Sequence, residues 1–153
     1  MEEQHHLDLK EAARHLQIAD HMTYVTFPLV NEHRLLLKIF DEIYASIIGC
    51  INAMLNYESL YKRIRLYPGF EDNFETFIKI ARNYDLSNEQ IKKITEIIDL
   101  NKKHKQSAIE FVRQERVVIM SDSLRTQVID LIVIKKYLLL AKELMVRVRK
   151  KVS

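Results

Sequence analysis

Hydrophobic residues recur at helical spacing along most of the chain. The clearest case lies between residues 31 and 66, where apolar side chains follow one another in steps of four and three. This spacing is typical of helices that pack along a coiled-coil or bundle seam. The residues of this seam are Leu36, Phe40, Ile43, Ile47, Cys50, Met54, Tyr57, Tyr61 and Ile64. We therefore expect one long helix here, ended by the Pro-Gly pair in "YPGF".

A second seam with helical spacing lies near the end of the sequence. Its members are Leu124, Val128, Leu131, Ile134, Leu138, Ala141, Met145 and Val148. The segment "SDS" (121–123) offers side-chain oxygens that cap helix N-termini, so a last helix is expected from there to about residue 150. We expect the two long helices to lie antiparallel. Because both extend beyond a compact single-chain core, their seams favour a homodimer or a helical protein partner.

Shorter helices are predicted in the rest of the chain. Residues 7–24, residues 71–84 and a segment from Ser87 onward carry apolar side chains on one helical face. We expect Pro28 to break the first of these, and Ser87 and Gln90 to form a capping box at the start of the third. The spacing of Ser107 and Glu110 is that of a second capping box, which predicts that a helix restarts there.

The segment "RVVIM" (116–120) leaves three alternatives open. It is short, apolar and β-branched, so it is a helix end, a buried turn or a lone strand without a partner. The chain has only two glycines and two prolines in 153 residues, fewer than sheets and their turns normally use. The sequence thus predicts an all-α fold: a bundle of about five to six helices, in a single domain over residues 1–153.

The uncharged stretch "YASIIGCINAML" (44–55) has three interpretations: a membrane span, a reactive-thiol site or a packing seam. Charged residues bound it, so it is too short to cross a bilayer. Ala45, Gly49 and Ala53 recur every four residues, and such a ridge of small side chains lets another backbone approach closely. Cys50 lies beside the ridge, with no basic or histidine neighbour in sequence to activate its thiol. We interpret these four residues as a helix-packing seam.

Composition narrows the class of protein. Hydrophobic residues make up 48% and charged residues 29%, which fits a globular fold, and the net charge of +3 is only weakly basic. One cysteine cannot form an internal disulfide, and the N-terminal residues lack the apolar segment of a secretory signal, so we expect a cytoplasmic location. The sequence has no metal-ligand spacing, Gly-rich phosphate loop or nucleophile elbow, so no metal or cofactor is expected.

Long antiparallel helices with a basic balance resemble the HEPN superfamily, many of whose members are ribonucleases or nucleotide-binding partners of toxins. Active members carry an arginine, a polar residue and, four to six positions further on, a histidine. "RNYDLS" opens with Arg82 and Asn83 but has Ser87 where the shortest spacing needs the histidine. "RHLQIADH" fits the spacing, from Arg14 to His21. The resemblance implies a ribonuclease or toxin–antitoxin component with Arg14 and His21 as its catalytic pair.

Three basic clusters lie near predicted helix C-termini. The first is Lys62, Arg63 and Arg65; the second is Lys102, Lys103 and Lys105; the third is Arg147, Arg149, Lys150 and Lys151. Cations interleaved with tyrosines can neutralise phosphates and stack on bases. Cations at helix C-termini also interact favourably with the helix dipole, and we favour this second interpretation.

Two hypotheses about function follow from these patterns. The leading one is a non-catalytic interaction or scaffold protein that acts through its long helices, by self-association or by binding a helical partner. The alternative is an RNA- or DNA-binding protein, including a HEPN-like ribonuclease. That alternative requires the three basic clusters to converge on one face.

Overall fold

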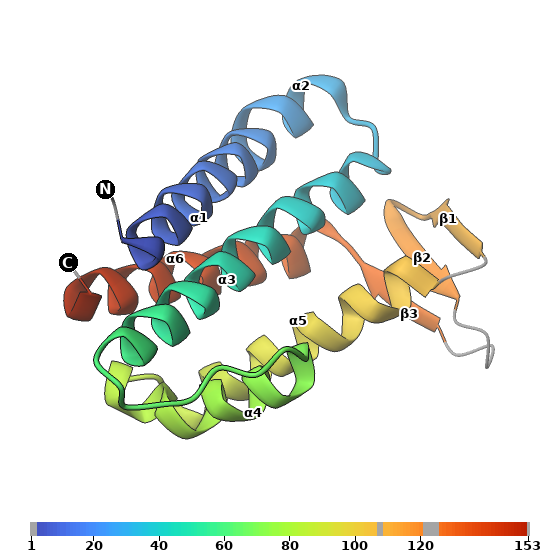
Figure 1. Cartoon of the computed structure of the whole chain (residues 1–153). Helices are drawn as coiled ribbons and strands as arrows, with labels where there is room; N and C mark the ends of the chain where they lie inside the picture. Colours follow the sequence, from blue (N-terminus) through green and yellow to red (C-terminus); the bar gives the residue numbers. More distant parts are fainter. Residues whose placement is uncertain (1–2, 107–108, 121–125, 153) are drawn as a thin grey trace.

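The computed structural model describes residues 3–106, 109–120 and 126–152, and this part of the chain is mostly helical with one small sheet (Figure 1). The helices are α1 (Gln4–His21), α2 (Phe27–Val30), α3 (Leu35–Leu60), α4 (Phe70–Ile80), α5 (Asn88–Gln106) and α6 (Leu131–Val152). The strands are β1 (Ile109–Arg113), β2 (Arg116–Met120) and β3 (Thr126–Ile129). The predicted bundle is thus found together with a sheet that the all-α prediction did not include.

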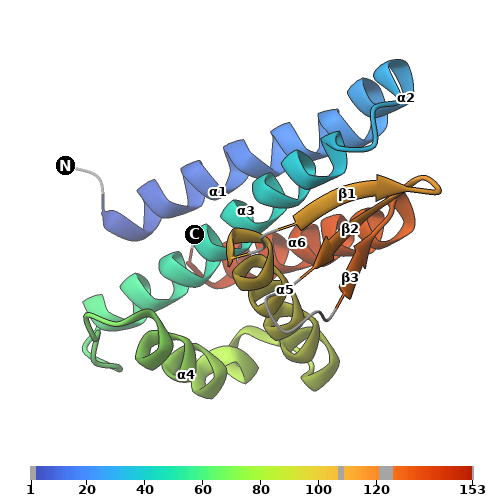
Figure 2. The ribbon, with the colours of Figure 1, turned by 90° about the vertical axis from the view of Figure 1, so that its right-hand side faces the viewer.

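Helix α3 lies at the centre of the molecule, between α1 and α4 (Figures 1 and 2). Its predicted seam is buried within the chain, from Leu36 to Met54. Helix α1 runs antiparallel to α3. Asn56, near the end of α3, donates a hydrogen bond from Nδ2 to Asp8 Oδ2 near the start of α1, and Glu42, near the start of α3, contacts His15 further along α1. The heptad pattern of α3 therefore serves the core of one molecule.

Helix α6 packs on another side of α3 and runs in the same direction. Near the start of both helices the rings of Phe40 and Tyr137 lie 6.1 Å apart. Further along, Arg149 of α6 is near enough to Cys50 of α3 for its charge to oppose the rise in the thiol pKa that burial causes. The predicted antiparallel arrangement of the two long helices is therefore wrong for α3 and α6, and it is α1 that runs antiparallel to α3.

Helices α1 and α3 approach one another closely at Gly49. A Cβ atom at this position would lie 2.8 Å from Ala12 Cβ, 3.2 Å from Ala12 Cα and 3.3 Å from the carbonyl oxygen of Asp8. The backbones of α1 and α3 can come this close only because Gly49 has no side chain and Ala12 has a small one. This is the kind of approach expected of the ridge formed by Ala45, Gly49 and Ala53.

Pro28 does not end the first helical segment. Helix α1 continues through one π-helical turn (Met22–Thr26) into α2, where Pro28 occupies the first turn, and the segment ends at Asn31 with a left-handed φ of 52°. The π-helical turn makes its hydrogen bonds over five residues, as from the Phe27 N–H to the Met22 carbonyl oxygen, and Pro28 follows directly after this change in the bonding pattern. The predicted break at Pro28 is therefore wrong.

Strands β1, β2 and β3 form an antiparallel sheet with the order β1-β2-β3. The segment "RVVIM" is the central strand β2, with Val117 and Ile119 buried and Val118 paired to Phe111 on one side and Val128 on the other. The prediction that a helix restarts at Ser107 is wrong for the residues that follow, because Glu110 lies in β1; Ser107 itself lies outside the described residues. The last helix begins at Leu131, since the segment before it is β3.

The capping box at the start of α5 is confirmed. The backbone N–H of Gln90 donates to Ser87 Oγ at 3.1 Å, and the backbone N–H of Ser87 donates to Gln90 Oε1 at 2.9 Å. These reciprocal bonds satisfy two groups that the first turn of a helix would otherwise leave without acceptors.

The β1–β2 hairpin turns through two residues with left-handed backbones, Gln114 (φ 50°) and Glu115 (φ 63°). Such turns favour asparagine and glycine, because a side chain with a Cβ is strained at positive φ. We expect Glu115→Gly to raise the free energy of unfolding by about 1 kcal/mol, measured by urea unfolding. Arg113→Gly, in the neighbouring strand, is the matched control and should be destabilising; an equal effect of both changes would contradict the role of the turn.

Candidate functional site

The first basic cluster follows the end of α3 and is bound to neighbouring side chains. Arg63 Nε donates to Glu58 Oε2 at 2.7 Å, and the guanidinium lies 4.9 Å from the ring centre of Tyr61. Arg65 lies over the ring of Tyr67. The charge of Arg63 is thus directed toward its own chain.

The third basic cluster ends α6 and lies near the first. Lys151 Nζ donates to the carbonyl oxygen of Asn83 at 2.6 Å and lies 5.0 Å from the ring centre of Tyr84. Burial raises the pKa of Tyr84, and Arg63 of the first cluster is near enough for its charge to oppose that rise. The C-terminal ends of α3 and α6 share one end of the molecule (Figure 1). The structure therefore brings the first and third clusters together.

The second basic cluster lies at the end of α5, near the sheet and away from the other two (Figure 1). Lys102 lies 3.6 Å from Glu71 and Lys105 lies 3.6 Å from Asp41. The three clusters do not converge on one face, which is the arrangement that a nucleic-acid-binding surface built from all of them requires.

Arg14 and His21 are placed on α1 with different partners. Arg14 Nη2 donates to Glu11 Oε1 at 2.6 Å, whereas His21 Nδ1 lies 3.5 Å from Thr26 Oγ1. The two side chains lie two helical turns apart, since seven residues separate them. Helix α1 does not bring them into contact with one another.

Cys50 and Ala53, in the predicted seam, are fully buried. Burial raises the pKa of the Cys50 thiol to about 12, so the thiol is protonated at neutral pH and does not act as a nucleophile. Within the described ranges no group of three or more His, Cys, Asp or Glu side chains is arranged to hold a metal ion. None of the helices described here has the length and apolar character needed to cross a membrane.

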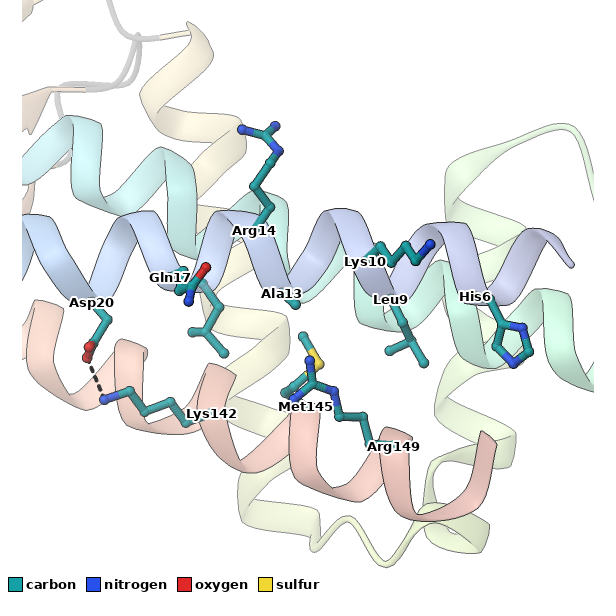
Figure 3. Close-up of a pocket in the computed structure, with 11 residues that line it drawn as sticks. His6, Leu9, Lys10, Ala13, Arg14, Gln17, Asp20, Lys142, Met145 and Arg149 are labelled. Carbon is teal, nitrogen blue, oxygen red and sulfur yellow. Dashed lines mark ion pairs between the residues drawn. The ribbon is translucent and has the colours of Figure 1, made fainter. Parts of the chain in front are cut away.

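A groove with a volume of about 750 Å³ runs between α1 and α6 (Figure 3). Leu9 and Ala13 of α1 and Met145 of α6 form an apolar floor. Arg149 projects into the groove from α6, and no hydrogen bond or ion pair is found for it within the described ranges. Lys142 lies at the other end, paired with Asp20 at 2.6 Å.

A second hollow of about 380 Å³ continues this groove along α6, and Lys142 lines both. Its walls include Tyr24, which follows α1, and Ile132 and Leu139 of α6. The ammonium groups of Lys135 and Lys142 lie 5.4 and 5.6 Å from the ring centre of Tyr24. We call the two hollows together, with the exposed side of α6, the α1–α6 surface.

The exposed side of α6 carries an apolar stripe. Ile132, Leu139 and Val146 are spaced by seven residues and are 66%, 58% and 64% exposed. The predicted seam of α6, from Ile134 to Val148, is buried against the core instead. Helix α6 is therefore apolar on two sides, and its 22 residues include seven basic residues and one acidic residue.

The apolar stripe on α6 was not identified from the sequence. A signal was present, because three large apolar residues recur at heptad spacing outside the predicted seam. It was obscured by the continuous apolar run "YLLLA" (137–141), in which buried and exposed positions look alike.

Comparison with known proteins finds no family model that matches the chain, and no curated protein or solved structure that is significantly similar to it.

Proposed function

We propose that this chain is a non-catalytic helical interaction protein, and that it binds a helix of another protein molecule on the α1–α6 surface. The observation that carries the proposal is the exposed stripe of Ile132, Leu139 and Val146 beside a groove with an apolar floor. Apolar side chains at heptad spacing on an exposed helix are the positions that a partner helix covers. Covering them would remove three large apolar side chains from water.

The balance of charge and apolar area favours protein over nucleic acid as the ligand. A phosphate backbone is bound by cations and hydrogen-bond donors, and an apolar stripe along the centre of the surface gains nothing from it. The cations here flank the stripe: Lys135 and Lys136 lie on one turn of α6 and Arg149 lies nearly four turns further. This arrangement, an apolar centre with a charged rim, is typical of protein interfaces.

Site-specific photo-crosslinking in cells tests this proposal. A photoreactive residue in place of Leu139 is expected to form an adduct with one discrete protein species, whereas the same residue in place of Lys92, exposed on α5, is not. Because the stripe is expected to hold the partner, Ile132→Ser with Val146→Ser should abolish the adduct at 139. Adducts that are the same at both positions, or that contain RNA and no protein, would contradict the proposal.

A further inference from the structure

We infer that the helix bound on the α1–α6 surface is α4 of a second copy of this chain, so that copies assemble head to tail. The inference rests on the proposed function and adds the identity of the partner. Three observations carry it: the exposed side of α4, the charge of α6, and the positions of these two helices in the fold.

The exposed side of α4 is partly apolar and acidic on balance, because it carries Glu71, Asp72 and Glu75 against one lysine, Lys79. Glu71, Glu75 and Ile78 follow one another in steps of four and three, which places them on one helical face. The Glu71 side chain is 86% exposed, and Phe70 and Ile78 are exposed as well. The ion pair between Glu71 and Lys102 is long and solvent-exposed, so little is lost when Glu71 changes partner. Helix α4 thus has the amphipathic acidic face that a basic, apolar surface binds.

The charge of α6 disfavours a symmetric contact between two α6 helices and favours α4. With seven basic residues and one acidic residue on each α6, two such helices would place like charges opposite one another. Against α4, by contrast, the lysines that flank Leu139 face Glu71 and Glu75, and Ile78 can cover the apolar stripe. Opposite charge and apolar contact then act together.

The fold keeps α4 away from the α1–α6 surface of its own chain. Helix α4 lies on the other side of α3 from α1 in both views (Figures 1 and 2). The contact must therefore join two molecules, and it uses a different surface on each. Such a contact leaves one free α4 and one free α6 surface at the two ends, so it extends into a chain unless it closes into a ring.

Sedimentation velocity of the purified protein tests the inference. In low salt the weight-average sedimentation coefficient is expected to rise with protein concentration, and added NaCl should reverse the rise because it screens exposed charges. Leu139→Glu removes the α6 contact and Glu75→Lys removes the α4 contact. Both residues are exposed, so each variant should fold as the wild type does, while its dissociation constant for self-association rises about tenfold or more.

Mixing the two variants identifies the geometry. At concentrations where each variant alone is monomeric, the intact α4 of Leu139→Glu can still bind the intact α6 surface of Glu75→Lys, so the mixture should form a one-to-one dimer. If Glu75→Lys self-associates like the wild type while Leu139→Glu does not, the contact is symmetric and the inference is wrong. It is also wrong if the wild type stays monomeric at every concentration. In that case an adduct with a different protein at position 139 would leave the proposed function standing.

Discussion

Replacing Gly49 by leucine is expected to lower the free energy of unfolding by about 3 kcal/mol. The first atom of the new side chain would lie 2.8 Å from Ala12 Cβ and 3.3 Å from the Asp8 carbonyl oxygen, a distance that only movement of the α1 backbone can relieve. Leucine favours the helix over glycine by about 1 kcal/mol, which offsets only part of this cost. Urea unfolding followed by circular dichroism measures the change.

Two controls separate the contact from the change of residue. Asn52→Leu places the same side chain at an exposed position of the same helix, and Gly69→Ser replaces a glycine whose Cβ would have Asp72 Oδ2 as its nearest neighbour, at 3.8 Å. Both should stay within about 0.5 kcal/mol of the wild type. A Gly49→Leu variant as stable as these two would show that α1 and α3 are not in close contact.

A double-mutant cycle tests which atoms meet. In Gly49→Ala the new methyl group meets the methyl group of Ala12, and Ala12→Gly removes that neighbour. The two changes together should therefore cost less than the sum of their separate costs, with a coupling energy of about 1 kcal/mol. Strict additivity would place the strain of Gly49→Ala on other atoms.

The heptad spacing predicted the helices and their buried sides correctly, but it did not predict what covers those sides. The spacing from Leu36 to Met54 predicted the helix and its buried side, and both are found in α3. It could not tell whether the buried side faces another molecule, because α1 and α6 satisfy the same pattern within one chain. The inference of self-association from these seams therefore lacks support, and the exposed stripe on α6 now carries the proposal instead.

The sheet was missed because strand pairing is not local. Arg116–Met120 has the β-branched character of a strand, but its partners Ile109–Arg113 and Thr126–Ile129 follow segments with helix-capping residues. A strand is stabilised by the residues opposite it, and the sequence does not show which residues those are. The Ser87 capping box, which involves only neighbours along the chain, was predicted correctly.

The residues of the candidate surface could be predicted only in part from the sequence. Arg147, Arg149, Lys150 and Lys151 were identified as one basic cluster, yet Lys151 is bound to the carbonyl of Asn83, whereas Arg149 projects into the groove. Charge density along the chain does not reveal which cations are already paired. That depends on acceptors far away in sequence, as Asn83 is from Lys151.

His104 links three elements of the fold and is expected to make stability depend on pH. Its Nδ1 lies 2.5 Å from Glu110 Oε2 of β1, and its Nε2 lies 3.1 Å from Asp41 Oδ1 of α3. Its side chain is only 10% exposed. The imidazolium therefore ties the sheet to the central helix, and Lys105 adds a second cation beside Asp41.

The direction of the pH effect follows from the pKa of His104. The carboxylates of Asp41 and then Glu110 raise this pKa above its ordinary value, against the opposing effect of burial. The stabilisation from the charged ring is thus fully present below the unfolded-state pKa of about 6.5 and is lost as the pH rises through the higher folded-state value. Burial alone would raise the pKa of Asp41, but its cationic partners lower it, and that contribution is lost only in acid.

His104→Gln is expected to lower the free energy of unfolding by about 2 kcal/mol at pH 5.5 and by much less at pH 9, where the wild-type ring is neutral. Urea unfolding at a series of pH values measures both proteins. The difference between them isolates His104 from His5, whose pKa is lowered by burial and which therefore changes stability in the opposite direction. His21→Gln, at an exposed position of α1, should keep the wild-type profile. If the curves for wild type and His104→Gln run parallel from pH 5.5 to 9, the ring carries no charge in this contact, and the pH dependence arises from other groups.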